Sequence, residues 1–152
     1  MTVPSLVSNI ENAIARLLPH SLASAALRIA LAVPFFRSGL LKWDGFGQIS
    51  ESAVLLFTEE FKLHVFGNVI DYPMPALVAH GAGIAEVCLP ILLVLGIGTR
   101  FAAFGLLMMT AIIQITVPDG WPIHLTWAAM ALAIIALGAG KFSLDHLLSR
   151  KN

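Results

Sequence analysis

Four stretches of the chain are long and apolar enough to cross a lipid bilayer, and this feature limits the fold more than any other. A helix needs about 20 apolar residues to cross a hydrocarbon core of about 30 Å. The four stretches run over residues 21–41, 74–96, 101–117 and 122–138. Residues 101–113 are apolar on every face, whereas a helix on a soluble core would show one polar stripe. The pattern predicts an all-α integral membrane protein, a bundle of four transmembrane helices.

The composition agrees with a membrane protein and excludes two classes of function. Hydrophobic residues make up 58% of the 152 residues and charged residues 12%, whereas a soluble domain carries about 25% charged residues. Nine basic and nine acidic residues give a formal net charge of zero, so no basic surface is expected to bind the phosphates of a nucleic acid. The single cysteine excludes an internal disulfide and a Cys-x-x-Cys redox or zinc motif.

Two short amphipathic helices are predicted outside the spans. Residues 4–18 carry apolar side chains at helical spacing and are expected to lie on the membrane surface before the first span. Residues 42–73 form the long connection, and an interfacial or partly re-entrant helix is expected there. Its apolar face is formed by Val54, Phe57, Phe61 and Val65. After the fourth span, Ser143 is predicted to be the N-cap of a final helical turn.

The distribution of basic residues predicts the orientation of the chain. Lys and Arg concentrate in the cytoplasmic loops of membrane proteins. One side of the predicted bundle carries Arg16, Arg100, Lys141, Arg150 and Lys151, and the other carries Lys42 and Lys62. We therefore expect a multi-pass protein of the cell inner (plasma) membrane, with both termini in the cytoplasm and residues 42–73 outside.

Arg28 and Glu86 lie within predicted spans, where a charge costs a few kcal/mol on insertion scales. At about 1.5 Å per residue, Glu86 lies about 15 Å and Arg28 about 10 Å from the cytoplasmic ends of their spans. A long arginine side chain bridges that difference, which predicts an Arg28–Glu86 ion pair. The alternative is that Arg28 extends to the interface and Glu86 is protonated.

Polar side chains also collect at the outer ends of the predicted helices. A candidate ligand pocket above Glu86 consists of Gly39, Lys42, His80, Gln114 and His124. Gly39 lets a neighbouring helix or a flat ligand come close. A quinone head group needs hydrogen-bond donors at this depth, and histidine titrates near neutrality, which suits proton exchange with a quinol. The alternative is an interfacial belt of polar and aromatic residues without a ligand.

No metal site is predicted. His80 and Glu86 are six residues apart, so their side chains point about 120° away from each other on one helix. His80 and His124 alone provide too few ligands for a tight site.

Several short motifs, in their order and spacing, resemble the DoxX family of small four-helix membrane proteins. The match runs from Arg28 to Leu147 and includes the segments 39–42 (GLLK), 96–100 (GIGTR) and 138–145 (GAGKFSLD), with Glu86 between the first two. The family is named for a subunit of a terminal quinol oxidase, and a relative forms part of a thiosulfate:quinone oxidoreductase. The resemblance implies one DoxX-like membrane domain over residues 1–152 and a partner in redox metabolism.

Two classes of function remain open after the resemblance. The first is an accessory or anchor subunit of a redox system, linked to quinone or to oxidant, thiol or sulfur stress, with a quinone between the helices as its cofactor. Its partner would be a redox enzyme or another membrane subunit, or further copies of itself in a homo-oligomer. The second is a small transport or permeation protein with Arg28 and Glu86 along an intramembrane path. The sequence carries no flavin motif and no dithiol, so we expect an oxidoreductase subunit rather than an independent enzyme.

Overall fold

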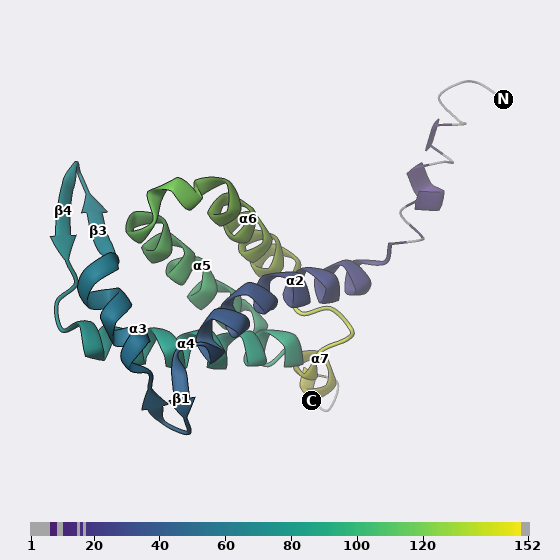
Figure 1. Ribbon diagram of the computed structural model, residues 1–152. Coiled ribbons are helices and arrows are strands. Elements are labelled where there is room, and N and C mark those ends of the chain that lie inside the picture. The colour runs from purple at the N-terminus through teal and green to yellow at the C-terminus, as the bar shows by residue number, and fades with distance from the viewer. Residues whose placement is uncertain (1–6, 9–10, 15, 17, 150–152) are drawn as a thin grey trace.

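The described part of the chain contains four long helices that are apolar enough to cross a membrane, which confirms the predicted all-α membrane bundle. The computed structural model describes residues 7–8, 11–14, 16 and 18–149. The long helices are α2 (His20–Leu40), α4 (Pro75–Leu95), α5 (Thr99–Thr116) and α6 (Trp121–Leu137), and a short α7 (Leu144–Ser149) follows (Figure 1). Within the predicted N-terminal helix over residues 4–18, residues 7–8, 11–14 and 16 are helical, and residues 4–6, 9–10, 15 and 17 lie outside the described part of the chain.

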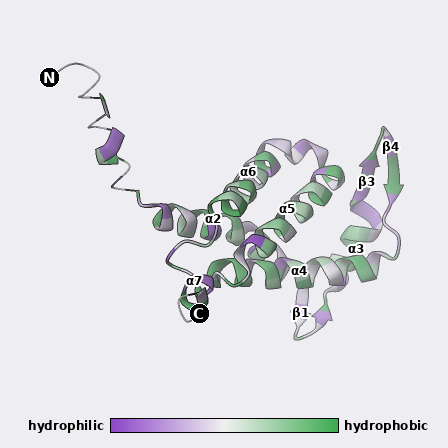
Figure 2. Ribbon diagram, turned by 180° about the vertical axis from the view of Figure 1, so that it is seen from behind, coloured by the Kyte–Doolittle hydropathy of each residue, from purple (hydrophilic) through white to green (hydrophobic). Residues whose placement is uncertain are grey.

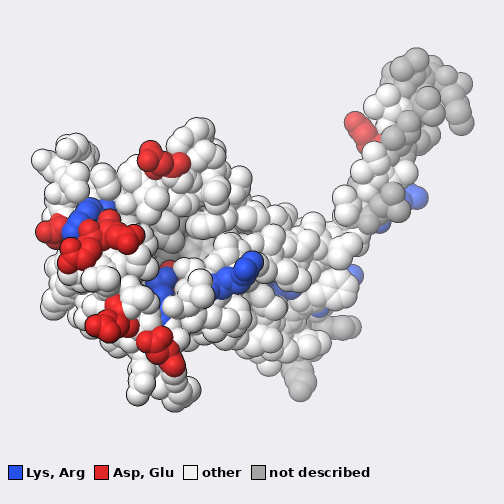
Figure 3. Space-filling model, viewed as in Figure 1, with Lys and Arg blue, Asp and Glu red and all other residues white. Residues whose placement is uncertain are grey.

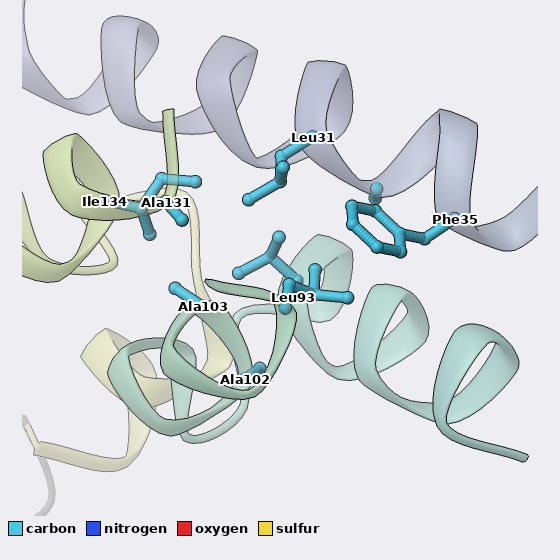
Figure 4. Packing of buried hydrophobic residues seen from close by; sticks show 9 residues of the cluster. Leu31, Phe35, Leu93, Ala102, Ala103, Ala131 and Ile134 are labelled. Carbon is cyan, nitrogen blue, oxygen red and sulfur yellow. The ribbon is translucent and has the colours of Figure 1, made fainter. Parts of the chain in front are cut away.

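The core lies where the four long helices meet. Helix α2 packs along α4, α5 packs along α6, and α2 also contacts α6. Buried side chains from all four helices point toward one another there (Figure 4), among them Leu31, Phe35, Leu93, Ala102, Ala103, Ala131 and Ile134. Three of these are alanines of α5 and α6, and small residues let helices pack closely in a membrane, where packing rather than water exclusion drives association.

The outward faces of the helices are also apolar. Large side chains such as Ile84, Phe104 and Leu132 are more than half exposed on α4, α5 and α6. Hydrophobic residues extend around these helices, whereas hydrophilic ones concentrate near their ends and in the hairpins (Figure 2). A surface of this kind is suited to contact with acyl chains. The chain is therefore a multi-pass membrane protein.

The connection over residues 42–73 differs from its prediction. The predicted helix is present only as α3 (Glu51–Leu55), which runs on into a π-helical turn, η1 (Leu56–Glu60). Antiparallel hairpins precede and follow it, formed by β1 (Trp43–Gly45) with β2 (Gln48–Ile49) and by β3 (Lys62–Val65) with β4 (Asn68–Asp71). Val65, predicted on the helix, belongs to β3. Gly47 and Gly67 provide the positive φ angles of 74° and 80° that the two turns need.

This connection, called the cap below, covers one end of the bundle. Phe57 and Tyr72 are buried and pack with Ala79 of α4. The Phe57 ring meets the rings of Phe61 and Tyr72 edge-on, at centroid distances of 5.2 and 5.4 Å, an arrangement that aromatic pairs favour. The cap end of the bundle is therefore the end where α2 and α5 finish and where α4 and α6 begin.

The opposite end is closed by the segment that contains α7. The Ser143 hydroxyl accepts a hydrogen bond from the His146 amide at 3.2 Å, which confirms the predicted N-cap. The Asp145 carboxylate accepts hydrogen bonds from the backbone amides of Gly98 (2.8 Å) and Thr99 (2.9 Å) at the start of α5. These contacts satisfy amides that a helix leaves unpaired at its N-terminus.

Candidate functional site

A buried ion pair joins α2 to α4. The ammonium nitrogen of Lys42 lies 2.5 Å from Oε2 of Glu86, and the two residues are 8% and 5% exposed. The same nitrogen donates to the Ser38 hydroxyl, one helical turn back, at 3.0 Å. Glu86 lies in the middle of α4, whereas Lys42 follows directly after α2. The cation therefore neutralises a carboxylate at a depth where an unpaired charge is costly.

The two residues meet because α2 and α4 approach closely at Gly39. A Cβ on Gly39 would lie 2.9 Å from the Glu86 carbonyl carbon and 2.9 Å from the Glu86 Cβ. The last turn of α2 therefore crosses the middle of α4. Residues 75–85 extend past this crossing by about 16 Å, at about 1.5 Å per residue. The first hairpin of the cap fills the space beside them, and Trp43 packs against Gly83.

The predicted Arg28–Glu86 ion pair is wrong. The Arg28 guanidinium lies at the far end of α4, where Nη1 donates to the carbonyls of Leu93 (3.4 Å) and Val94 (3.5 Å), and Nη2 donates to the Phe142 carbonyl. Leu93 is about 10 Å along α4 from Glu86. The prediction took α2 and α4 to start and end at the same depth, and their axial offset invalidates that assumption. Arg28 instead interacts with carbonyls at a helix C-terminus, where partial negative charge favours a cation.

A cavity of about 380 Å³ lies beside the ion pair, between the long helices and the cap. Lys42 and Glu86 are its charged lining residues. Most of its wall is apolar or aromatic, formed by residues such as Phe35, Phe57, Phe61, Met109, Ile113 and Trp127. Gly81 of α4 and Ile112 of α5 line it as well and are themselves exposed. The cavity therefore reaches the lateral surface of the bundle between α4 and α5.

Most polar groups around the cavity already have partners. The Thr116 hydroxyl donates to the Ile112 carbonyl at 2.8 Å, so the Tyr72 hydroxyl is the donor in its 2.6 Å contact with Thr116. Lys42 donates to Ser38 and Glu86. Of the two carboxylate oxygens of Glu86, only Oε2 has a hydrogen-bond partner among the described residues. Oε1 of Glu86 is therefore the acceptor that remains available to a ligand.

The other residues of the predicted pocket do not lie together at the cavity. His124 donates from Nδ1 to Oε1 of Gln114 at 2.9 Å, and Nε2 of Gln114 donates to the Pro118 carbonyl at 3.0 Å. The His124 ring also packs on Trp127, at a centroid distance of 5.3 Å. Because Trp127 lines the cavity, the His124–Gln114 pair supports its wall rather than facing a ligand.

His80 and Gly39 do not line the cavity. His80 donates from Nδ1 to the Ala76 carbonyl at 2.7 Å, and its ring meets Trp43 at 6.2 Å. It therefore lies on the face of α4 that the first hairpin covers. Gly39 serves helix packing, as its close approach to Glu86 indicates.

Sequence reasoning missed the aromatic residues that enclose the cavity. Phe57, Phe61 and Tyr72 come from the cap, and Trp127 comes from α6. The concentration of Phe57, Phe61 and Tyr72 in the connection before the span that carries Glu86 is the sequence signal that could have revealed the three cap residues. Among the described residues, no three His, Cys, Asp or Glu side chains gather as metal ligands.

Comparisons with known proteins identify one family to which the chain is similar. The family model of DoxX matches residues 23–119, which include most of α2 and all of the cap, α4 and α5. An uncharacterized protein of Haemophilus influenzae is 31% identical over 136 residues, and the match covers 82% of each chain. No solved structure matches the chain.

Proposed function

Because the chain belongs to the DoxX family, we propose that it is a membrane-embedded accessory or anchor subunit of a redox system, and that it binds a quinol beside Lys42 and Glu86. The observation that supports this proposal is that Glu86 lines an apolar, aromatic cavity while its Oε1 has no hydrogen-bond partner among the described residues. The partner would be a redox enzyme or another membrane subunit that carries the electron-transfer groups. A homo-oligomer is the alternative assembly.

The size and chemistry of the cavity suit a quinol head group. Its volume of about 380 Å³ falls within the range of about 300 to 1,000 Å³ that small-molecule sites occupy. Phe57 and Trp127 offer ring faces and edges to a flat aromatic ligand. A quinol hydroxyl is a donor and the ionised Glu86 carboxylate an acceptor, and such charge-assisted hydrogen bonds are stronger than neutral ones. The reduced form of a quinone, which carries the hydroxyl donors, is therefore the preferred ligand.

The lateral opening supports a ligand that arrives from the bilayer. Gly81 and Ile112 are exposed at the edge of the cavity, on faces of α4 and α5 that are otherwise apolar. A lipid-soluble molecule can enter there with its head group first and leave an apolar tail between the helices or among the acyl chains. A transport path through Arg28 and Glu86 has less support, because Arg28 is bound to the carbonyls of Leu93, Val94 and Phe142.

Filling the cavity is expected to abolish quinol binding. Ala85 lines the cavity, whereas Ala111 of α5 is exposed and outside it. The purified protein in detergent would be titrated with decylubiquinol under reducing conditions, with tryptophan fluorescence as the signal. In Ala85→Phe the phenyl ring occupies ligand volume, so we expect affinity to fall about tenfold or more. Ala111→Phe makes the same substitution outside the cavity and is expected to bind like the wild type. Equal affinity of the two variants would count against the site.

We also propose that both termini face the cytoplasm, in the cell inner (plasma) membrane. Arg100 and Lys141 lie near the α7 end of the spans, whereas most acids lie on the cap (Figure 3). Basic residues favour the cytoplasmic side. A phosphatase reporter is expected to be active when inserted in the cap, at the tip of the second hairpin, and inactive when fused after Asn152. The reverse pattern would invert the orientation.

A further inference from the structure

A second concavity lies at the α7 end of the bundle, and the proposed quinol site does not involve it. Its volume is about 590 Å³. The starts of α2 and α5, the segment 137–141 and the α7 segment surround it. Four of its lining side chains are basic, namely His20, Arg100, Lys141 and His146. Four separate segments thus bring basic groups into one hollow at the ends of the membrane spans.

Asp145 is the acidic residue that lines this concavity, and its charge is already compensated. Burial raises the pKa of the Asp145 carboxyl, but hydrogen bonds from Thr99 and Gly98 and the nearby Arg28 cation lower it further than burial raises it. The pKa therefore lies below its usual value, and the group is ionised at neutral pH. Its negative charge is stabilised by the hydrogen bonds at the start of α5 and by the Arg28 cation.

Arg100 and Lys141 are left without such compensation. Within the part of the chain that the structure describes, neither side chain forms a hydrogen bond or a salt bridge. The Arg100 guanidinium lies against Gly138, where a Cβ would stand 3.5 Å from its Nη2. Gly138 and Arg100 both line the hollow, and the glycine has no side chain that would cover the guanidinium. Two cations in one concavity form a site for an anion, and arginine matches the oxygens of a phosphate with paired donors.

The surroundings of the concavity indicate where the phosphate comes from. Exposed apolar side chains stand close to it in the chain: Phe101 follows Arg100, Phe142 follows Lys141, and Leu137 is itself a lining residue. They are 85%, 63% and 40% exposed. A site at the end of membrane spans, with apolar side chains beside its cations, lies at the depth of lipid head groups and next to their acyl chains.

We propose that this concavity binds the phosphate of an anionic phospholipid, held by Arg100 and Lys141. The membrane supplies this ligand at high local concentration, and free inorganic phosphate is the other source with the same chemistry. Scattered basic residues at a membrane surface would attract anionic lipid without a preferred position. Here two cations that have no partner among the described residues line one hollow, which defines a position.

The test uses the full-length protein in a neutral detergent, titrated in turn with phosphatidylglycerol, phosphatidylcholine and inorganic phosphate while thermal unfolding is followed. Each basic residue near an anionic lipid contributes about 1 kcal/mol, so we expect Arg100→Gln/Lys141→Gln to bind phosphatidylglycerol about thirtyfold more weakly. The matched control, Arg16→Gln/Arg37→Gln, removes the same charge outside the concavity and is expected to bind like the wild type. Binding of zwitterionic phosphatidylcholine is expected to be the same in all variants.

The outcomes distinguish a phospholipid from inorganic phosphate as the ligand, and both from a general effect of charge. Competition of inorganic phosphate with phosphatidylglycerol, dependent on Arg100 and Lys141, would support the phosphate site and assign it a soluble ligand. An equal loss of lipid affinity in both glutamine pairs would overturn the proposal in favour of a general charge effect, and so would no loss in either. The charge-conserving variant Arg100→Lys/Lys141→Arg is expected to retain most of the affinity. If it instead loses affinity as fully as the glutamine pair while unfolding at the wild-type temperature without lipid, two cations are not the basis of binding.

Discussion

Replacing either Lys42 or Glu86 alone with methionine is expected to destabilise the protein by about 3 to 5 kcal/mol, whereas replacing both should cost much less than the sum. Each single variant leaves one charge without its partner, on a residue that is at most 8% exposed. The double variant leaves no charge, and two unbranched apolar side chains of similar length take the space. Unfolding in mixed micelles would give the four free energies of the cycle.

Two other residue pairs in the chain serve as controls for this double-mutant cycle. Lys62 and Asp71 form a 2.8 Å ion pair on the cap in which the Asp71 side chain is 82% exposed. The same methionine substitutions there should change stability by about 1 kcal/mol or less. Arg28→Met combined with Glu86→Met is expected to give additive losses, because these residues bind different partners. Coupling of Glu86 to Arg28 with none to Lys42 would contradict the contacts described above.

Gly39→Ala is expected to destabilise the protein by about 1 to 3 kcal/mol, the usual cost of overpacking. The added methyl would lie 2.9 Å from the backbone of Glu86 and from a side-chain carbon of Val87. The backbone of Glu86 cannot rotate away from the methyl group, so α2 and α4 must separate. The Lys42–Glu86 contact lies next to this crossing and is expected to lengthen as the helices move apart. Gly39→Leu should have a larger effect, because the helices must move further. Thermal unfolding in detergent would measure both.

Gly81→Ala is the matched control for this substitution. Gly81 also lies within α4, but a Cβ there would meet no atom within 4 Å. Alanine is a better helix former than glycine by about 1 kcal/mol, so this variant is expected to be as stable as the wild type or slightly more stable. Equal losses at Gly39 and Gly81 would show that the close approach of α2 and α4 is not the cause.

Local sequence was enough to predict the spans. A bilayer requires each spanning segment to satisfy its own backbone hydrogen bonds, so an apolar stretch of sufficient length becomes a helix whatever its neighbours are. The boundaries of α2, α4, α5 and α6 accordingly lie close to those predicted. The role of Ser143 as a helix N-cap was also predictable, because its hydroxyl and the His146 amide that donates to it are three residues apart. The connection over residues 42–73 was only partly predictable, since its helix ends at Glu60, before Val65, and the hairpins depend on turns at Gly47 and Gly67.

The partner of Glu86 was decided by the tertiary structure. Sequence shows how far each residue lies along its own helix, but the relative depth of two helices depends on where their surfaces fit. Here the absent side chain of Gly39 brings the last turn of α2 against the middle of α4, which moves Lys42 to the level of Glu86 and Arg28 to the level of Leu93. The cavity has the same origin, because its wall combines four helices with the cap, and Tyr72 reaches Thr116 across 44 positions of sequence. Contacts of this kind depend on how side chains of distant segments pack, and no periodicity in the chain encodes them.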